Sequence, residues 1–138
     1  MTGPDFLDTN ILVYTYVPAD ARKQKTAQGI VGRALSGEGI ASSQVMAEFA
    51  STLLHKVARL TRPEEVLIAL DALGAMRLVQ PDHGMVRRAV EARAAYGIYF
   101  YDGMIVAAAE RGGCGRILSE DLNAGQKYFQ IPVENPFD

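Results

Sequence analysis

Metal-ligating and disulfide-forming side chains are scarce in this sequence. Cys114 is the only cysteine, and His55 and His83 are the only histidines. A single cysteine cannot form a disulfide within the chain, and structural zinc sites usually need several cysteine ligands. The sequence therefore excludes an internal disulfide and a cysteine-rich zinc site, and it argues against a histidine-rich metal site.

Long apolar runs are also missing. The longest strongly apolar run, residues 105–109, is far shorter than the roughly 20 residues that cross a bilayer. Residues 1–5 lack the basic start and apolar stretch of a secretory signal. These absences predict a soluble, cytoplasmic protein with no membrane partner.

Neither sign of charge is in strong excess. The chain has 14 Lys and Arg against 16 Asp and Glu, a net charge of −2. This balance alone argues against a nucleic-acid partner, because such domains are usually basic. If cations occupied four of the acids, however, 12 would remain against 14 basic residues. The net charge therefore does not decide the class of partner.

Short apolar segments alternate with longer helical patterns along the chain. At 138 residues, 49% hydrophobic and 22% charged, with no repeat or linker, the composition predicts one folded domain over residues 1–138. We expect strands at 5–8, 39–42, 76–80, 116–119 and 131–134. We expect helices at 10–16, 20–35, 43–59, 62–73, 82–96 and 102–111. This alternation predicts an α/β fold, a three-layer α/β/α sandwich with a mostly parallel central sheet.

Two helix starts carry capping signals. Thr61 and Glu64 are spaced as a capping box, with Pro63 in the first turn, and Asp82 is placed to cap the helix expected at 82–96. In parallel sheets, ligands bind beyond the carboxyl ends of the strands, where the strand order reverses. Polar residues that follow the expected strands are therefore candidates for a site.

The segment PDFLDTNILVY places Asp8 directly after the apolar pair Phe6 and Leu7, with Thr9 and Asn10 behind it. An unpaired carboxylate at the end of a buried strand is unfavourable. Asp8 either caps the next helix or faces a cation, and Thr9 and Asn10 are either turn residues or support for the same site.

Asp102 heads an apolar helix stripe that continues through Ile105 and Val106. It is either an N-cap or a site residue, and Gly103 after it permits close approach of a ligand or another backbone. Asp121 follows the strand expected at 116–119 and is either a cap or a site residue. Ser119 and Asn123 are possible helpers in that loop, whereas Glu120 is expected to face solvent.

Glu48 lies roughly opposite Met46 and Leu53 when residues 43–59 are drawn as a helix. Taken alone, this position favours a solvated helix face, on which His55 is an ordinary surface residue. Taken together, the four acids suggest a cluster that needs cations to offset its mutual repulsion. Oxygen ligands without a histidine or cysteine cluster indicate Mg²⁺ or Mn²⁺.

Four segments in this order resemble the PIN domain family, most closely the single-domain VapC-type toxin ribonucleases. They are FLDTNILVY, SSQVMAEF, YFYDGMIVAAAERGGCGRILSEDLNAGQ and the ending VENPF. The resemblance covers residues 5–137. It implies a parallel sheet between helices, and it carries the family's acidic residues over to Asp8, Glu48, Asp102 and Asp121, with Thr9 and Asn10 as polar support. Tyr101 departs from the small or polar residue often found before the third acid.

The resemblance implies metal-dependent hydrolysis of RNA phosphodiester bonds, with one or two Mg²⁺ or Mn²⁺ ions held by the four acids. It also implies an antitoxin partner and a homodimer. Tyr99, Phe100 and Tyr101 either stack on unpaired bases or pack in the core. The basic residues of two helices either contact RNA phosphates or form solvated faces: Arg22, Lys23, Lys25, Arg33, Arg87, Arg88 and Arg93.

Two other functions compete with this hypothesis. A non-catalytic PIN scaffold would bind RNA or protein without cutting, although all four acids are retained. A Mg²⁺-dependent phosphatase would use Asp8 as its nucleophile. Haloacid-dehalogenase phosphatases need a second aspartate two positions later, where this chain has Asn10, and this counts against a phosphatase.

Overall fold

A six-stranded sheet forms the centre of the molecule in the computed structural model, which describes residues 2–56 and 62–138. The strand order is β3-β2-β1-β4-β6-β5. The strands are β1 (Asp5–Leu7), β2 (Gly39–Ser42), β3 (Arg77–Val79), β4 (Arg116–Leu118), β5 (Lys127–Tyr128) and β6 (Ile131–Glu134). All neighbours pair in parallel except β5 and β6, which are antiparallel.

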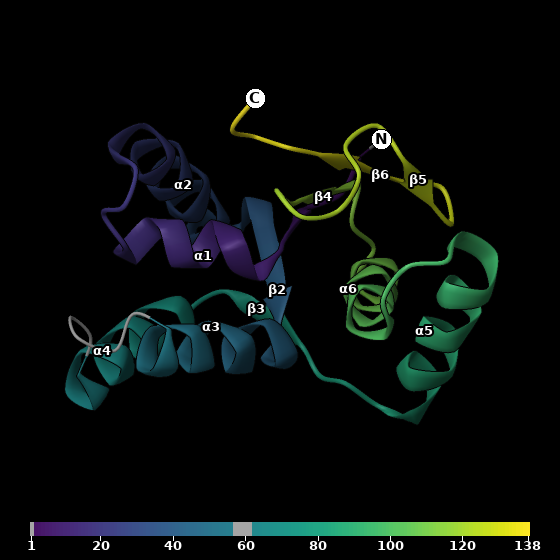
Figure 1. Ribbon diagram of the computed structural model, residues 1–138, viewed down its shortest axis with the longest axis horizontal. Helices are drawn as coiled ribbons and strands as arrows, with labels where there is room; N and C mark the ends of the chain where they lie inside the picture. The colour runs from purple at the N-terminus through teal and green to yellow at the C-terminus, as the bar shows by residue number, and fades with distance from the viewer. Residues whose placement is uncertain (1, 57–61) are drawn as a thin grey trace.

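Helices flank this sheet. They are α1 (Thr9–Tyr16), α2 (Ala21–Arg33), α3 (Ser43–His55), α4 (Pro63–Leu73), α5 (His83–Tyr96) and α6 (Phe100–Arg111), with a π-helical turn η1 (Ala34–Glu38) after α2. Figure 1 shows α1 to α4 grouped on one side of the molecule and α5 and α6 packed together on the other. The predicted α/β/α fold with a mostly parallel sheet is confirmed.

The central strands are buried because helices cover both faces of the sheet. Phe6 and Leu7 in β1, and Ile117 in β4, are fully buried, and Leu118 is nearly so. Parallel sheets covered on both faces need such continuous apolar runs. Within the described ranges, no helix combines the length and the apolar character needed to cross a membrane.

Most predicted boundaries agree with the structure within two residues, and the exceptions have local causes. Strand β5 was not predicted because two residues are too few to show a pattern. The helix expected at 20–35 ends as an α-helix at Arg33, and the chain turns through Gly37, whose φ is 102°. Helix α3 ends at His55 with Lys56 as its C-cap residue, so the helix expected to 59 ends earlier than predicted, and residues 57–59 lie outside the described residues.

Capping agrees in part with the prediction. Asp82 caps α5, and its side chain accepts a hydrogen bond from the Met85 backbone N–H at 2.9 Å. Helix α4 begins at Pro63, one residue later than expected, and its N-cap residue is Arg62 rather than the predicted Thr61. Thr61, which was predicted to complete a capping box there, lies outside the described residues.

Helix α6 lies unusually close to α5 at Gly103. A Cβ atom added to Gly103 would lie 2.7 Å from the carbonyl oxygen of Ala89 and 3.1 Å from its Cα. The close approach that Gly103 permits is therefore to another backbone. Because Gly103 directly follows Asp102, this helix contact also sets the position of that carboxylate.

We predict that Gly103→Ala destabilises the protein by about 1–3 kcal/mol, because the added methyl group must separate two packed helices. Chemical denaturation measures the change in the free energy of unfolding. Gly32→Ala in α2 is the matched control, since nothing lies within 4 Å of the added Cβ. That control is expected to be neutral or to stabilise by up to about 1 kcal/mol. Equal effects of the two substitutions would contradict the packing argument.

Candidate carboxylate site

Asp8 lies at the point where the strand order reverses. Strand β1 pairs with β2 on one side and with β4 on the other, and the chain reaches β4 only after building β2 and β3. Asp8 follows β1, and its backbone N–H donates to the Leu118 carbonyl at 3.1 Å. The prediction that Asp8 stands at the carboxyl end of a central strand is confirmed.

The N-cap interpretation of Asp8 is confirmed. Asp8 is the N-cap residue of α1, and its Oδ1 accepts from the Thr9 backbone N–H at 2.7 Å. Its Oδ2 accepts from the Ser119 hydroxyl at 2.7 Å. The residue is only 6% exposed. Two hydrogen bonds therefore fix the orientation of a buried carboxylate, which still has lone pairs to offer a ligand.

The surroundings of Asp8 disfavour its charged form. The pKa of Asp8 is raised from 3.8 to about 6, chiefly by burial. The hydrogen bonds from Ser119 and Thr9 oppose this rise, whereas the nearby charges of Asp121 and Asp102 add to it. A buried acid next to other acids is poised to bind a cation, because the cation removes the repulsion.

Asp102 belongs to the same electrostatic cluster. Its pKa is raised by partial burial first, and then by the charges of Asp121 and Glu48. It lies in the first turn of α6, where the N-cap residue is Tyr99. The N-cap alternative for Asp102 is therefore wrong. Its charge near the helix start is still favoured by the helix dipole.

Glu48 faces the site from α3. Its Oε1 accepts from the Gln44 side chain at 2.9 Å, and its Oε2 lies 3.4 Å from the hydroxyl of Thr9, which donates to it. Glu48 is half-buried, so the solvated-face alternative is wrong for this residue. It is right for His55, which is exposed. Thr9 thus connects the first and second predicted site segments.

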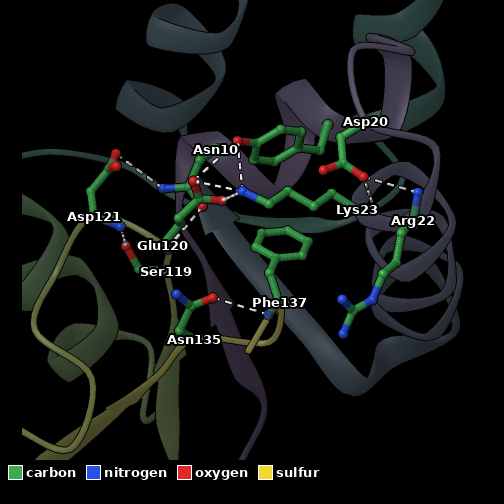
Figure 2. A network of polar contacts seen from close by, with 10 residues as sticks. Asn10, Asp20, Arg22, Lys23, Ser119, Glu120, Asp121, Asn135 and Phe137 are labelled. Carbon is green, nitrogen blue, oxygen red and sulfur yellow. Dashed lines mark hydrogen bonds and ion pairs between the residues drawn. The ribbon is translucent and has the colours of Figure 1, made fainter.

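Asp121 is exposed and is held by Asn10 (Figure 2). The Asn10 side-chain amide donates to Asp121 Oδ2 at 3.1 Å, and its Oδ1 accepts from the Glu120 backbone N–H at 3.1 Å. The Ser119 hydroxyl oxygen accepts from the backbone N–H groups of Asp121 and Leu122, both at 3.1 Å. Asn10 and Ser119 therefore position two of the four carboxylates.

Asn123, the remaining predicted helper, has different neighbours. It is exposed, and its carbonyl accepts from the Gln126 backbone N–H at 3.1 Å, which closes a turn. It also acts on Tyr128: burial is the main cause of the raised pKa of that phenol, and Asn123 opposes the rise. These contacts make Asn123 part of the loop rather than a direct support of the carboxylates.

A network that sequence reasoning missed anchors the loop of Asp121 (Figure 2). Lys23 of α2 lies 3.1 Å from both carboxylate oxygens of Glu120, and the Tyr14 hydroxyl donates to Glu120 Oε1 at 3.1 Å. The Lys23 ammonium group also lies 5.1 Å from the centre of the Tyr14 ring and 5.6 Å from that of Phe137. The expectation that Glu120 faces solvent is therefore wrong.

The four candidate acids take no part in the ion pairs found among the described residues. Those pairs use other acids: Asp5, Glu64, Asp82, Glu91, Glu110, Glu120 and Glu134. The site residues have the donor chemistry that a hard divalent cation requires. Over residues 2–56 and 62–138, however, no three acidic, histidine or cysteine side chains already stand together closely enough to hold a metal ion. The four acids thus have the charge and the donor atoms that suit a cation, but in the described residues they do not form a preformed set of ligands.

A cavity of about 780 Å³ lies away from the carboxylates. Its lining includes Asp5, Gly39, Arg77 and Arg116. These residues belong to the amino-terminal ends of the parallel strands, opposite the end that bears Asp8. Arg116 is already paired there with Asp5, at 2.8 Å. The cavity and the candidate carboxylates therefore lie at opposite ends of the sheet.

Residues 6–129 match the model of the PIN domain family. The matched range includes all four candidate acids, and the chain belongs to this family. A comparison with curated proteins found no match. The PIN domain is a nuclease-type fold, and members of the family generally hydrolyse nucleic acids with divalent metals.

We predict that Asp8→Asn stabilises the protein in chelator-containing buffer at pH 7. The raised pKa of Asp8 means that the folded state holds its proton more tightly than the unfolded state, so stability falls as the pH rises from about 4 to about 6. At pH 7 the free energy of unfolding of the variant should therefore exceed that of the wild-type protein by up to about 3 kcal/mol. Denaturation of both proteins across this pH range measures it. The advantage of the variant should vanish below about pH 4, and equal stability at every pH would contradict the raised pKa.

Proposed function

We propose that this protein is a metal-dependent endoribonuclease that hydrolyses RNA phosphodiester bonds. One observation carries the proposal: Asp8 is buried at the carboxyl end of β1, its pKa is raised, and among the described residues it has no cationic partner. The charges of Asp102 and Asp121 raise the pKa of Asp8 further, and the charge of Glu48 raises the pKa of Asp102. Membership of a nuclease-type family supports the reaction class.

We propose that Asp8, Glu48, Asp102 and Asp121 hold the catalytic ion or ions. When bound, Mg²⁺ or Mn²⁺ supplies Lewis acidity, which lowers the pKa of an attacking water and offsets charge on the phosphate. The chain's own residues set the geometry. Ser119 orients Asp8, Asn10 orients Asp121, and Thr9 and Gln44 orient Glu48. Glu48 or Asp121 orients the water for attack on phosphorus in line with the leaving oxygen.

The phosphatase alternative is weakened further by the role of Asn10. A phosphatase that uses Asp8 as nucleophile would need a free general acid at that position. Here both ends of the Asn10 amide are engaged, with Asp121 and with the Glu120 backbone. Asn10 therefore has a structural task that suits a site built from several carboxylates.

The non-catalytic scaffold has one observation in its favour: no three candidate ligands stand together among the described residues. In the nuclease interpretation, cation binding brings the carboxylates together, since the ion removes the repulsion that separates them. In the scaffold interpretation, no ion does so. The two therefore differ in metal binding as well as in cleavage.

We propose further that the enzyme is the toxin of a VapBC-type toxin–antitoxin pair, acts in the cytoplasm, binds a cognate antitoxin and forms a homodimer. The resemblance of its four motifs to VapC-type ribonucleases supports this. Among the basic residues considered for RNA, Lys23 pairs with Glu120 and Arg88 with Glu110, so these two are engaged within the chain. Arg22, Lys25, Arg33, Arg87 and Arg93 are exposed, and we propose them as phosphate contacts; of these, Arg93 also donates to the Ile98 carbonyl at 3.0 Å.

The direct test is cleavage of a mixed single-stranded RNA by the purified protein in Mn²⁺. We expect Asp8→Asn to lower the rate by about 100-fold or more, the order expected when a strong electrostatic group is removed from an active site. Asp71→Asn, the same change at an exposed position of α4, is the control and should keep the rate. RNA retained without cleavage would favour the scaffold, and phosphate release from small esters would favour the phosphatase.

Metal binding has a readout that does not depend on activity. We predict that Mn²⁺ raises the melting temperature of the wild-type protein, because an ion bound only to the folded state stabilises it by about 3 kcal/mol at 100 times its Kd. Thermal denaturation with and without Mn²⁺ measures the shift. Asp71→Asn should keep it, whereas Asp8→Asn and Asp102→Asn should lose most of it. A shift of the same size in all four proteins would place the ion elsewhere.

A further inference from the structure

A groove of about 420 Å³ lies beside the carboxylate site, between α3 and the start of α6. It is lined in part by Glu48, Lys56, Tyr99 and Tyr101. Its volume falls in the range of about 300–1,000 Å³ that is usual for small-molecule sites. Because Glu48 belongs to both, a ligand in this groove would lie next to the proposed reaction centre.

The two tyrosines present aromatic surface to this groove. Tyr99 is 64% exposed and Tyr101 50% exposed, and their ring centres lie 5.8 Å apart with planes tilted by 49°. Phe100 between them packs against the core. The YFY segment is thus divided: its central ring stabilises the fold, and its outer rings are left at the surface. Large exposed aromatic side chains gathered at one place often mark a binding site.

The polar groups of the groove suit a neutral ring flanked by a phosphate. Glu48 lies at the side of the carboxylate cluster, and Lys56 supplies a positive charge elsewhere in the lining. Ser51 adds a hydroxyl group that can donate or accept. A nucleobase is uncharged and carries both donors and acceptors, so it avoids repulsion by Glu48. The ammonium group of Lys56 complements the adjoining phosphate.

We propose that this groove is a base-binding subsite, in which an unpaired base of RNA stacks on Tyr99 and Tyr101. The inference rests on the proposed ribonuclease function and adds to it a preference for single-stranded substrate. Bases within a duplex stack on one another and cannot offer their faces to side chains, whereas unpaired bases can. A nucleotide within RNA has a phosphate on each side of its base: one would lie on the Lys56 side, and the other on the Glu48 side, beside the carboxylates.

The test measures RNA affinity without cleavage, in Mg²⁺ and in the Asp8→Asn background, with a short fluorescent single-stranded RNA of mixed sequence. We expect Tyr99→Ala with Tyr101→Ala to raise the Kd by about 5- to 150-fold, the range that corresponds to the loss of one stacked base. Tyr99→Phe with Tyr101→Phe keeps the rings and should retain the affinity. Ile68→Ala, which removes exposed apolar surface on α4, is the control and should leave the Kd unchanged. Duplex RNA should bind the parent and the double-alanine variant alike.

The same pairs of substitutions in the active protein separate failure of the subsite from failure of the proposed function. We expect the alanine pair to raise KM for single-stranded RNA with little change in kcat. If the alanine pair cleaves RNA with unchanged KM and Kd, the subsite proposal is wrong and the nuclease proposal is unaffected. Tyrosines that serve a protein interface instead would give this result. An absence of both cleavage and RNA binding in the wild-type protein would overturn both.

Discussion

The electrostatic environment of one carboxylate organises the proposed site. Asp8 is carried by β1 into the place where the sheet reverses its strand order, between the loops that follow β1 and β4. Burial there makes its charged form costly, and Ser119 and Thr9 offset only part of that cost. A charge held under these conditions needs a partner. No basic side chain of the described residues is paired with Asp8. A bound cation is therefore the simplest partner to propose for this carboxylate.

The rest of the molecule holds other carboxylates near Asp8. Asn10 and Ser119 connect the loop after β4 to the start of α1, and Thr9 connects α1 to Glu48 on α3. The Lys23–Glu120 pair lies behind this loop and joins it to α2, with Phe137 from the C-terminal segment packed beside it. At Gly103, close packing of α6 against α5 sets the position of Asp102. Repulsion among the four acids is thus opposed by neutral donors and by packing, and no arginine of residues 2–56 and 62–138 forms an ion pair with them.

Much of the fold and of the site was predictable because the signals are local. β1 is marked by an apolar run that Asp8 follows, and β4 by an apolar run that Ser119 follows. The alternation of strands and helices predicts a parallel sheet, in which the carboxyl ends of the strands lie at one edge. Glu48 was harder, since helical periodicity places it opposite the core but does not show that α1 covers that face. The Lys23–Glu120 pair joins residues 97 positions apart and leaves no local pattern. The division of the YFY segment into one partly buried and two exposed rings is likewise set by tertiary packing.

The central claim is that these carboxylates form a cation site that the ion itself completes. A crystal structure of the protein grown with Mn²⁺, with anomalous scattering to locate the metal, tests this most directly. The account predicts an anomalous peak within coordination distance, about 2.0–2.6 Å for such oxygen ligands, of an Asp8 oxygen, with Asp102 or Asp121 drawn toward it. Manganese bound only elsewhere, or an Asp8 carboxylate that contacts nothing beyond Ser119 and Thr9 at saturating Mn²⁺, would contradict it.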